Sequence, residues 1–172
     1  MSLETNAVRG TVSHYGPRDE DMRYGGTNTN RNGEIKAKFT FDFDELPEAT
    51  AINLDHVIPS GSTILSANFR VITGFTSTST TTDLTVGLAD ADGGSNITDA
   101  GGIFTAAELT QTVIAATGVT AASSGALVGA TLSEAAVVTV APNVDDLTAG
   151  RAVLEITYQN AFPASYSSPT GT

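Results

Sequence analysis

Hydrophobic and polar residues alternate without a break over residues 35–44. The odd positions are apolar, with Phe39, Phe41 and Phe43 among them, and the even positions carry Lys, Thr or Asp. Successive side chains of a strand point to opposite faces, so this pattern predicts a β-strand with one buried and one solvated face. Three Phe on one face would fill much of a core, and Pro47 is expected to end the strand.

Shorter stretches of this kind recur along the chain, separated by segments rich in Gly, Pro, Asp, Ser and Thr. Strands are expected at residues 51–58, 64–75, 84–88, 135–141 and 151–158. The intervening segments contain the residue types that form turns. About six to eight short strands at this spacing, without an internal repeat, predict an all-β fold, either an antiparallel β-sandwich or a jelly roll.

One short helix is expected in the second half of the chain. Thr105-Ala106-Ala107-Glu108 matches a capping box, in which the Thr hydroxyl and the Glu carboxylate each accept a hydrogen bond from a backbone N–H. Ala, Leu and Gln follow, so the motif predicts a helix over residues 106–111. The pattern does not place residues 111–135, much of which is rich in Gly, Ala and Ser.

The composition divides the chain into three parts. Residues 1–33 contain few large aliphatic residues and are expected to form an extended N-terminal arm. Residues 34–162 hold the predicted strands and form the β-sandwich, or jelly-roll-like, domain. Residues 163–172 are rich in Pro, Ser, Thr and Gly and are expected to be an extended C-terminal tail.

The arm contains a mixture of Tyr and Arg. These residues are Arg9, Tyr15, Arg18, Arg23, Tyr24 and Arg31. Tyr and Arg are enriched where one protein binds another, so we expect this set to dock the arm on a partner. The alternative is a solvated terminus that makes no such contact.

The charge is distributed unevenly along the chain. Residues 1–38 hold six basic and five acidic residues and net +1, whereas the remainder holds two basic and fourteen acidic residues and nets −12. An acidic body repels nucleic acids and anionic lipids, and no segment reaches the roughly 18 apolar residues of a membrane span. Residues 1–10 are polar and do not resemble a signal peptide. We therefore expect no nucleic-acid or membrane partner; solubility is the simpler interpretation of the acidity.

The residue types that enzymes use are scarce. There is no Cys, which excludes disulfides and thiolate metal sites. His14 and His56 are the only histidines, and no nucleophile-elbow, Ser/Lys or phosphate-loop motif accompanies them. Sugar-binding platforms and glycosidase clefts usually need aromatic residues, but the chain has no Trp. We expect no enzymatic activity and no cofactor.

One segment has the composition of a calcium loop. Asp90, Asp92, Asn96 and Asp99 offer oxygen ligands, but Gly101 stands where an EF-hand loop has its closing Glu. The favoured interpretation is an ordinary Asp/Gly turn, and we expect no metal.

Several short motifs occur in a fixed order. They are Tyr15-Gly16-Pro17-Arg18, Arg23-Tyr24-Gly25-Gly26, Asp-Phe-Asp-Glu-Leu-Pro at 42–47, Ile58-Pro59-Ser60-Gly61-Ser62, Leu-Thr-Val-Gly-Leu-Ala-Asp at 84–90 and Leu147-Thr148-Ala149-Gly150-Arg151. In this order, over most of residues 15–160, the chain resembles small virion proteins of tailed phages, of the capsid decoration or cement type. Each motif alone is no more than a strand or a turn, so the resemblance depends on their order.

The resemblance implies a jelly-roll-like homotrimer on the outer surface of a capsid. There it would bind the major capsid protein and stabilise neighbouring capsomers. The charge and composition agree with this: the acidic body would face outward, and the Tyr and Arg residues of the arm would dock across a subunit boundary. Two other functions stay open. One is a fibre-tip or receptor-binding module for host-surface glycans, which would need a concave aromatic site. The other is a polysaccharide depolymerase.

Overall fold

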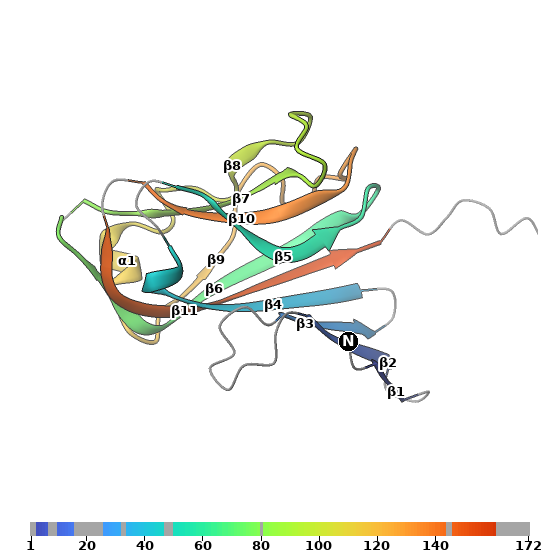
Figure 1. Ribbon diagram of the computed structural model, residues 1–172, viewed down its shortest axis with the longest axis horizontal. Helices are drawn as coiled ribbons and strands as arrows, with labels where there is room; N and C mark the ends of the chain where they lie inside the picture. Colours follow the sequence, from blue (N-terminus) through green and yellow to red (C-terminus); the bar gives the residue numbers. More distant parts are fainter. Residues whose placement is uncertain are drawn as a thin grey trace, which may run out of the picture.

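The computed structural model describes residues 3–6, 10–15, 26–31, 34–46, 50–79, 81–143 and 146–160. Within these residues the chain forms β-strands, one short α-helix and one turn of 3-10 helix. The strands build two antiparallel sheets that stack as a sandwich (Figure 1). This confirms the predicted all-β class with a single short helix.

The two sheets differ in size. The large sheet has the order β1-β2-β3-β4-β11-β6-β9. Its strands are β1 (Leu3–Asn6), β2 (Gly10–Tyr15), β3 (Gly26–Arg31), β4 (Glu34–Asp42), β11 (Leu147–Gln159), β6 (Thr63–Ser77) and β9 (Thr120–Ala122). The small sheet has the order β5-β10-β7-β8. Its strands are β5 (Ile52–Ile58), β10 (Ala136–Pro142), β7 (Leu84–Asp90) and β8 (Asp99–Phe104).

The pairing of the strands follows the plan of a jelly roll. β4 pairs with β11, β5 with β10, β6 with β9 and β7 with β8, so that each pair lies inside the previous one along the chain. Two further pairings, β11 with β6 and β10 with β7, join these pairs into sheets. A chain that folds as one long antiparallel hairpin and then rolls up produces this arrangement, with its two Greek keys.

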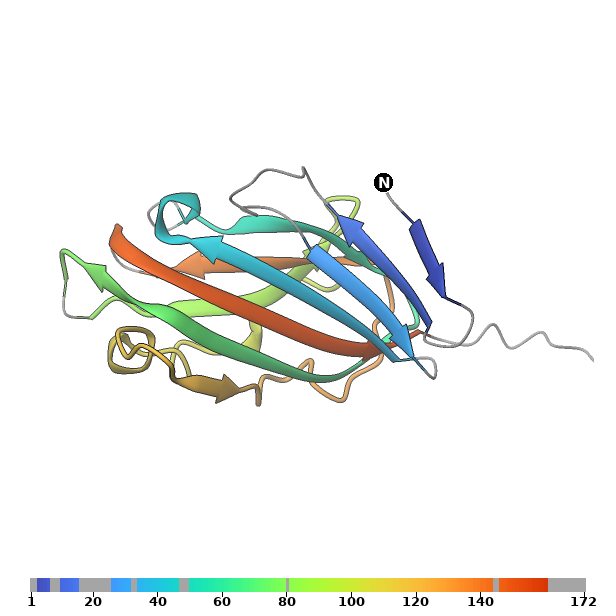
Figure 2. The ribbon, with the colours of Figure 1, turned by 90° about the horizontal axis from the view of Figure 1, so that it is seen from below.

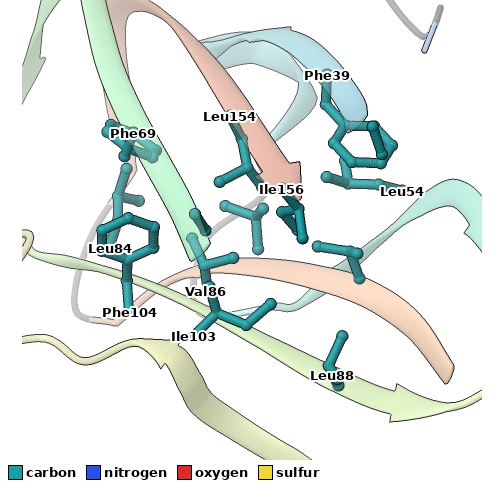
Figure 3. Packing of buried hydrophobic residues seen from close by; sticks show 14 of the residues in the cluster. Phe39, Leu54, Phe69, Leu84, Val86, Leu88, Ile103, Phe104, Leu154 and Ile156 are labelled. Atoms are coloured by element: carbon teal, nitrogen blue, oxygen red, sulfur yellow. The ribbon is translucent and has the colours of Figure 1, made fainter. Parts of the chain in front are cut away.

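The inner faces of both sheets supply one hydrophobic core (Figure 3). In β4 alternate residues from Ile35 to Phe41 are buried, and those between them are exposed or half-buried. Phe69 of β6 is fully buried, and its ring centroid lies 5.9 Å from that of Phe41 and 6.2 Å from that of Phe104. Because Phe104 belongs to β8, these aromatic contacts join the large sheet to the small one.

The first predicted strand ends earlier than its pattern suggested. β4 stops at Asp42, and Phe43 begins the 3-10 turn η1 (Phe43–Glu45), where it is only partly buried against the core. Glu45 accepts a hydrogen bond from the backbone N–H of Asp42 (2.9 Å), which closes this turn before Pro47 is reached. The alternating pattern therefore continues for two residues, Phe43 and Asp44, beyond the strand itself.

The helix lies later in the chain than predicted. α1 comprises Gln111–Ile114, and residues 106–108 form a turn. Glu108 does accept a hydrogen bond from the backbone N–H of Thr105 (2.7 Å), but the Thr105 hydroxyl donates to the same carboxylate (3.0 Å) instead of accepting from the backbone. Half of the expected capping box is therefore present, and it stabilises a turn ahead of the helix.

The described parts of residues 1–33 are strands at one edge of the large sheet. β3 pairs with β4, β2 with β3 and β1 with β2, as Figure 2 shows. The predicted division into arm, domain and tail stays a prediction, and the tail at residues 163–172 lies outside the described residues. No helix in the described part of the chain is long and apolar enough to cross a membrane.

Candidate docking surface

Strands β4, β11 and β6 lie side by side in the large sheet (Figure 2). Alternate residues of these three strands form the centre of its outer face. Strand alternation directs these side chains to solvent, because their chain neighbours are buried in the core. The strand register sets them in rows across the sheet. Two adjacent rows are Lys38–Glu155–Asn68 and Thr40–Val153–Arg70.

Two ion pairs connect β4 and β11 on this face. Arg151 donates to Asp42 from Nε to Oδ1 and from Nη2 to Oδ2, each at 2.6 Å, which is a bidentate arrangement. Nζ of Lys36 lies 2.8 Å from Oε2 of Glu155. Exposed ion pairs contribute only about 0–1 kcal/mol to stability. Their main consequence here is that four charges of the face are neutralised internally.

Lys38 and Arg70 remain as unpaired cations on the same face. Both side chains are exposed, and neither makes a hydrogen bond or ion pair with the residues that the structure describes. They border a hollow of about 260 Å³, which is also lined by Ile72, Val153, Asn68, Thr120 and Glu155. Ile72 is 38% exposed, which is unusual for so large an aliphatic side chain in this molecule. The centre of the face thus combines two unpaired positive charges with accessible apolar surface.

The positive charges of the sandwich are confined to this face. Residues 34–160 contain only four Lys or Arg residues, which are Lys36, Lys38, Arg70 and Arg151. All four lie on β4, β6 or β11 and are at least partly exposed. Residues 71–150, by contrast, contain eight Asp or Glu and no Lys, Arg or His. They include β7, β8 and β10 of the small sheet, so the molecule has an acidic side opposite the side where its cations gather.

The structure places two of the six predicted docking residues of the arm. Tyr15 lies in β2, and Arg31 lies in β3, where its backbone pairs with Glu34 of β4. The other four, Arg9, Arg18, Arg23 and Tyr24, lie outside the described residues. The role of this set in docking stays a prediction.

Sequence reasoning did not single out the central part of the face as a site. Lys38 and Arg70 stand on the polar sides of two predicted strands, which was visible as alternation. They come together only because β11, from the far end of the chain, pairs with both β4 and β6. No local signal in the sequence encodes that pairing.

The carboxylates of the expected Asp/Gly turn accept hydrogen bonds from nearby backbone. Asp90 is 5% exposed, and its Oδ2 accepts from the backbone N–H of Asn96 (2.8 Å). Asp92 accepts from Gly94 (3.3 Å) and Asp99 from Gly101 (3.1 Å), which is typical of turns built around Asp. No group of three His, Cys, Asp or Glu side chains suited to a metal ion occurs in the described ranges.

His56 is a buried residue of β5. It is 5% exposed, and its Nε2 lies 2.9 Å from the hydroxyl of Tyr158. The rings of Phe39 and Tyr158 pack against it with centroid distances of 5.8 and 5.7 Å. Burial lowers the pKa of its imidazole, because the charged form loses solvation. This environment is that of a residue of the core.

Neither a protein-family model nor a curated protein sequence matches the chain. Three chains from solved structures of phage capsids have a similar fold. One belongs to the acidic stable capsid structure of Helicobacter pylori bacteriophage KHP30, with 18% identity, a TM-score of 0.52 and coverage of 76% of this chain and 90% of that one. Another belongs to the cyanophage Pam1 capsid asymmetric unit, with 18% identity, a TM-score of 0.52 and coverage of 91% and 97%. The third belongs to the capsid of Ralstonia phage GP4, with 16% identity, a TM-score of 0.53 and coverage of 78% and 88%. Similarity at these identities demonstrates a shared fold.

Proposed function

We propose that this chain is a structural protein of a tailed-phage capsid, which binds the outside of the shell and stabilises contacts between capsomers. The observation that carries the proposal is the similarity of its fold to chains of three phage capsid structures, over 76% to 91% of this chain and 88% to 97% of each of those. The order of short motifs along the sequence supports the same assignment independently.

The physical properties of the sandwich suit such a role. Its core joins both sheets, which gives a rigid body, and its charge is separated into an acidic side and a side that holds all four cations of residues 34–160. Such a separation orients a protein on a charged surface, because like charges repel and opposite charges attract. We assign no catalytic role, since the histidine of the sandwich is buried against Tyr158.

The arm and the oligomeric state belong to the same proposal. The six Tyr and Arg residues between Arg9 and Arg31 are assigned to docking on the major capsid protein, and the protein is assigned as a homotrimer. Ordering a segment costs about 1–2 kcal/mol per residue. Several copies acting together offset such a cost, because after the first contact the others form at a high effective concentration.

Co-sedimentation of the purified protein with capsids of the parent virus that lack it tests the proposal. Saturable binding at a fixed number of copies per capsid is expected, and that number identifies the symmetry axis. A well-folded protein that does not bind would refute the proposal and direct attention to host-surface glycans, which a glycan array would examine.

Two matched variants test the arm. Replacing Arg18, Arg23 and Arg31 with Ala is expected to weaken capsid binding by at least about tenfold, as loss of interface Arg residues commonly does. Replacing Asp19, Glu20 and Asp21 with Ala removes three negative charges from the same segment instead of three positive ones. This variant should bind as well as the wild-type chain or more tightly. Equal binding by both variants would remove the arm from the docking mechanism.

A further inference from the structure

We propose that the outer face of the large sheet is the face that docks on the shell, and that it receives an acidic protein surface there. The centre of this docking face is formed by Lys38, Arg70, Ile72 and Val153. The inference rests on the proposed function and adds to it the orientation of the molecule and the chemistry of its partner.

The charges on the face indicate what it binds. Lys36 and Arg151 are already paired within the sheet, with Glu155 and Asp42. Lys38 and Arg70 make no ion pair or hydrogen bond with the residues that the structure describes, although the chain carries a net charge of −11. Two cations without a partner among the described residues are available for carboxylates of another protein. An Arg side chain can bind a carboxylate through two parallel hydrogen bonds, which also fixes orientation.

Apolar side chains lie beside these cations. Ile72 is 38% exposed and lines the same hollow as Lys38, Arg70 and Val153, together with Asn68, Thr120 and Glu155. Arg is enriched in protein interfaces relative to the rest of the surface, where it occurs beside apolar side chains.

The size of the face is sufficient for stable docking. The sheet is seven strands wide, which corresponds to about 30 Å at about 4.8 Å per strand, and the nine residues of β4 are about 30 Å long. A face of about 900 Å² matches the roughly 800 Å² that each partner buries in a standard interface.

A second copy of this chain is the other acidic surface to consider. Its acidic side is the small sheet, which lies on the opposite side of the sandwich from the docking face (Figure 1). Contacts between opposite faces repeat in one direction and produce an open stack, whereas a closed ring needs faces inclined to each other. A different protein is therefore the partner that fits, and the acidic small sheet then points away from the shell.

Binding of full-length protein to capsids that lack it tests this orientation. Replacing Lys38 and Arg70 with Gln is expected to weaken binding by at least about tenfold. The control variant, Asn53→Asp with Ser133→Asp, also makes the chain more negative by two charges, but at exposed positions on the small sheet and its connection. It should bind within about twofold of wild type, since charges on the far side are screened within about 10 Å.

The outcomes separate this inference from the function on which it rests. If the wild-type chain binds and the variant Lys38→Gln with Arg70→Gln binds equally well, the docking face is overturned but the proposed function is not. The same holds if the Gln variant and the control variant lose binding to the same extent. No binding by the wild-type chain overturns the proposed function and this inference with it. Sedimentation velocity without capsids is a further test. If the wild-type chain is an oligomer and the Gln variant is a monomer, the face serves self-association, and the shell is excluded as its partner.

Discussion

At the scale of single residues, buried polar groups connect the stability of the fold to pH. His56 has a pKa below its ordinary value of about 6.5, because its imidazole is removed from solvent between Phe39 and Tyr158. The unfolded chain therefore takes up the proton more readily than the folded one. The free energy of unfolding should decrease as pH falls below about 6.5 and stay unaffected by this group at higher pH.

Replacing His56 with Gln should remove that part of the pH dependence. Urea unfolding between about pH 7.5 and pH 5.5 is expected to show a steeper loss of stability for the wild-type chain than for His56→Gln. The variant His14→Gln retains the buried imidazole and should keep its contribution. Parallel curves for wild type and His56→Gln would show that burial does not perturb this imidazole.

Glu108 also has a lowered pKa, but its cause is hydrogen bonding and not burial. Burial alone would raise the pKa of its carboxyl group, but hydrogen bonds from the backbone and hydroxyl groups of Thr105 and Ser124 hold it below its usual value. The stability it contributes is present above the unfolded-state pKa and is lost as pH falls towards the folded-state value. The carboxylate thus joins the turn after β8 to the segment that follows β9.

The variant Glu108→Gln should lower the free energy of unfolding at neutral pH by about 1 kcal/mol, because an amide cannot accept all four hydrogen bonds. The matched control is Glu134→Gln, whose exposed side chain makes no hydrogen bond within the described residues. It should change stability by less than about 0.5 kcal/mol. Equal effects in urea unfolding would show that Glu108 does not connect the two segments.

At the scale of elements, the long strand β11 depends on one glycine. Its register with β6 shifts before Gly150, between Leu147 and Ala149, then across it, between Ala149 and Arg151, and again after Arg151. Gly150 has φ of +133°, and a Cβ atom there would lie 2.2 Å from Cδ1 of Phe75. Irregularities of this kind bend a strand and increase its twist. Here they curve the first residues of β11 around the core.

The variant Gly150→Ala is expected to destabilise the fold by about 2–4 kcal/mol, through backbone strain and overpacking against Phe75. Gly101→Ala is the control, because the nearest atom to its added Cβ would be at 3.7 Å, an ordinary contact. It should cost less than about 1 kcal/mol. Thermal and urea unfolding of both variants would measure the difference, and equal destabilisation would contradict the role of Gly150.

At the scale of the whole molecule, the two sheets depend on one core. Phe69 of the large sheet is fully buried against Phe41 and against Phe104 of the small sheet. Phe69→Ala should lower the free energy of unfolding by about 3–5 kcal/mol. Both sheets should still unfold in one transition, so that tyrosine fluorescence and far-ultraviolet circular dichroism coincide. Two separated transitions would show that the sheets are independent units.

The sequence by itself determined the class of the fold and the buried face of its strands. Alternation from Ile35 to Phe41 identified the inner face of β4, because strand side chains alternate whatever their partners are. The same local rule was insufficient for the helix. Thr105 and Glu108 form hydrogen bonds that suit a turn as well as a helix, and the segment that follows decides between the two.

Only the tertiary structure decided which strands are neighbours, and with them the candidate docking face. Lys38, Val153 and Arg70 belong to segments far apart in the chain, and the pairing of β11 with both β4 and β6 brings them onto one surface. Strand pairing depends on how the whole chain buries its apolar faces together. Local patterns therefore showed which side of each strand faces solvent, whereas the packing of the whole chain decided which of these solvent-exposed sides form a single surface.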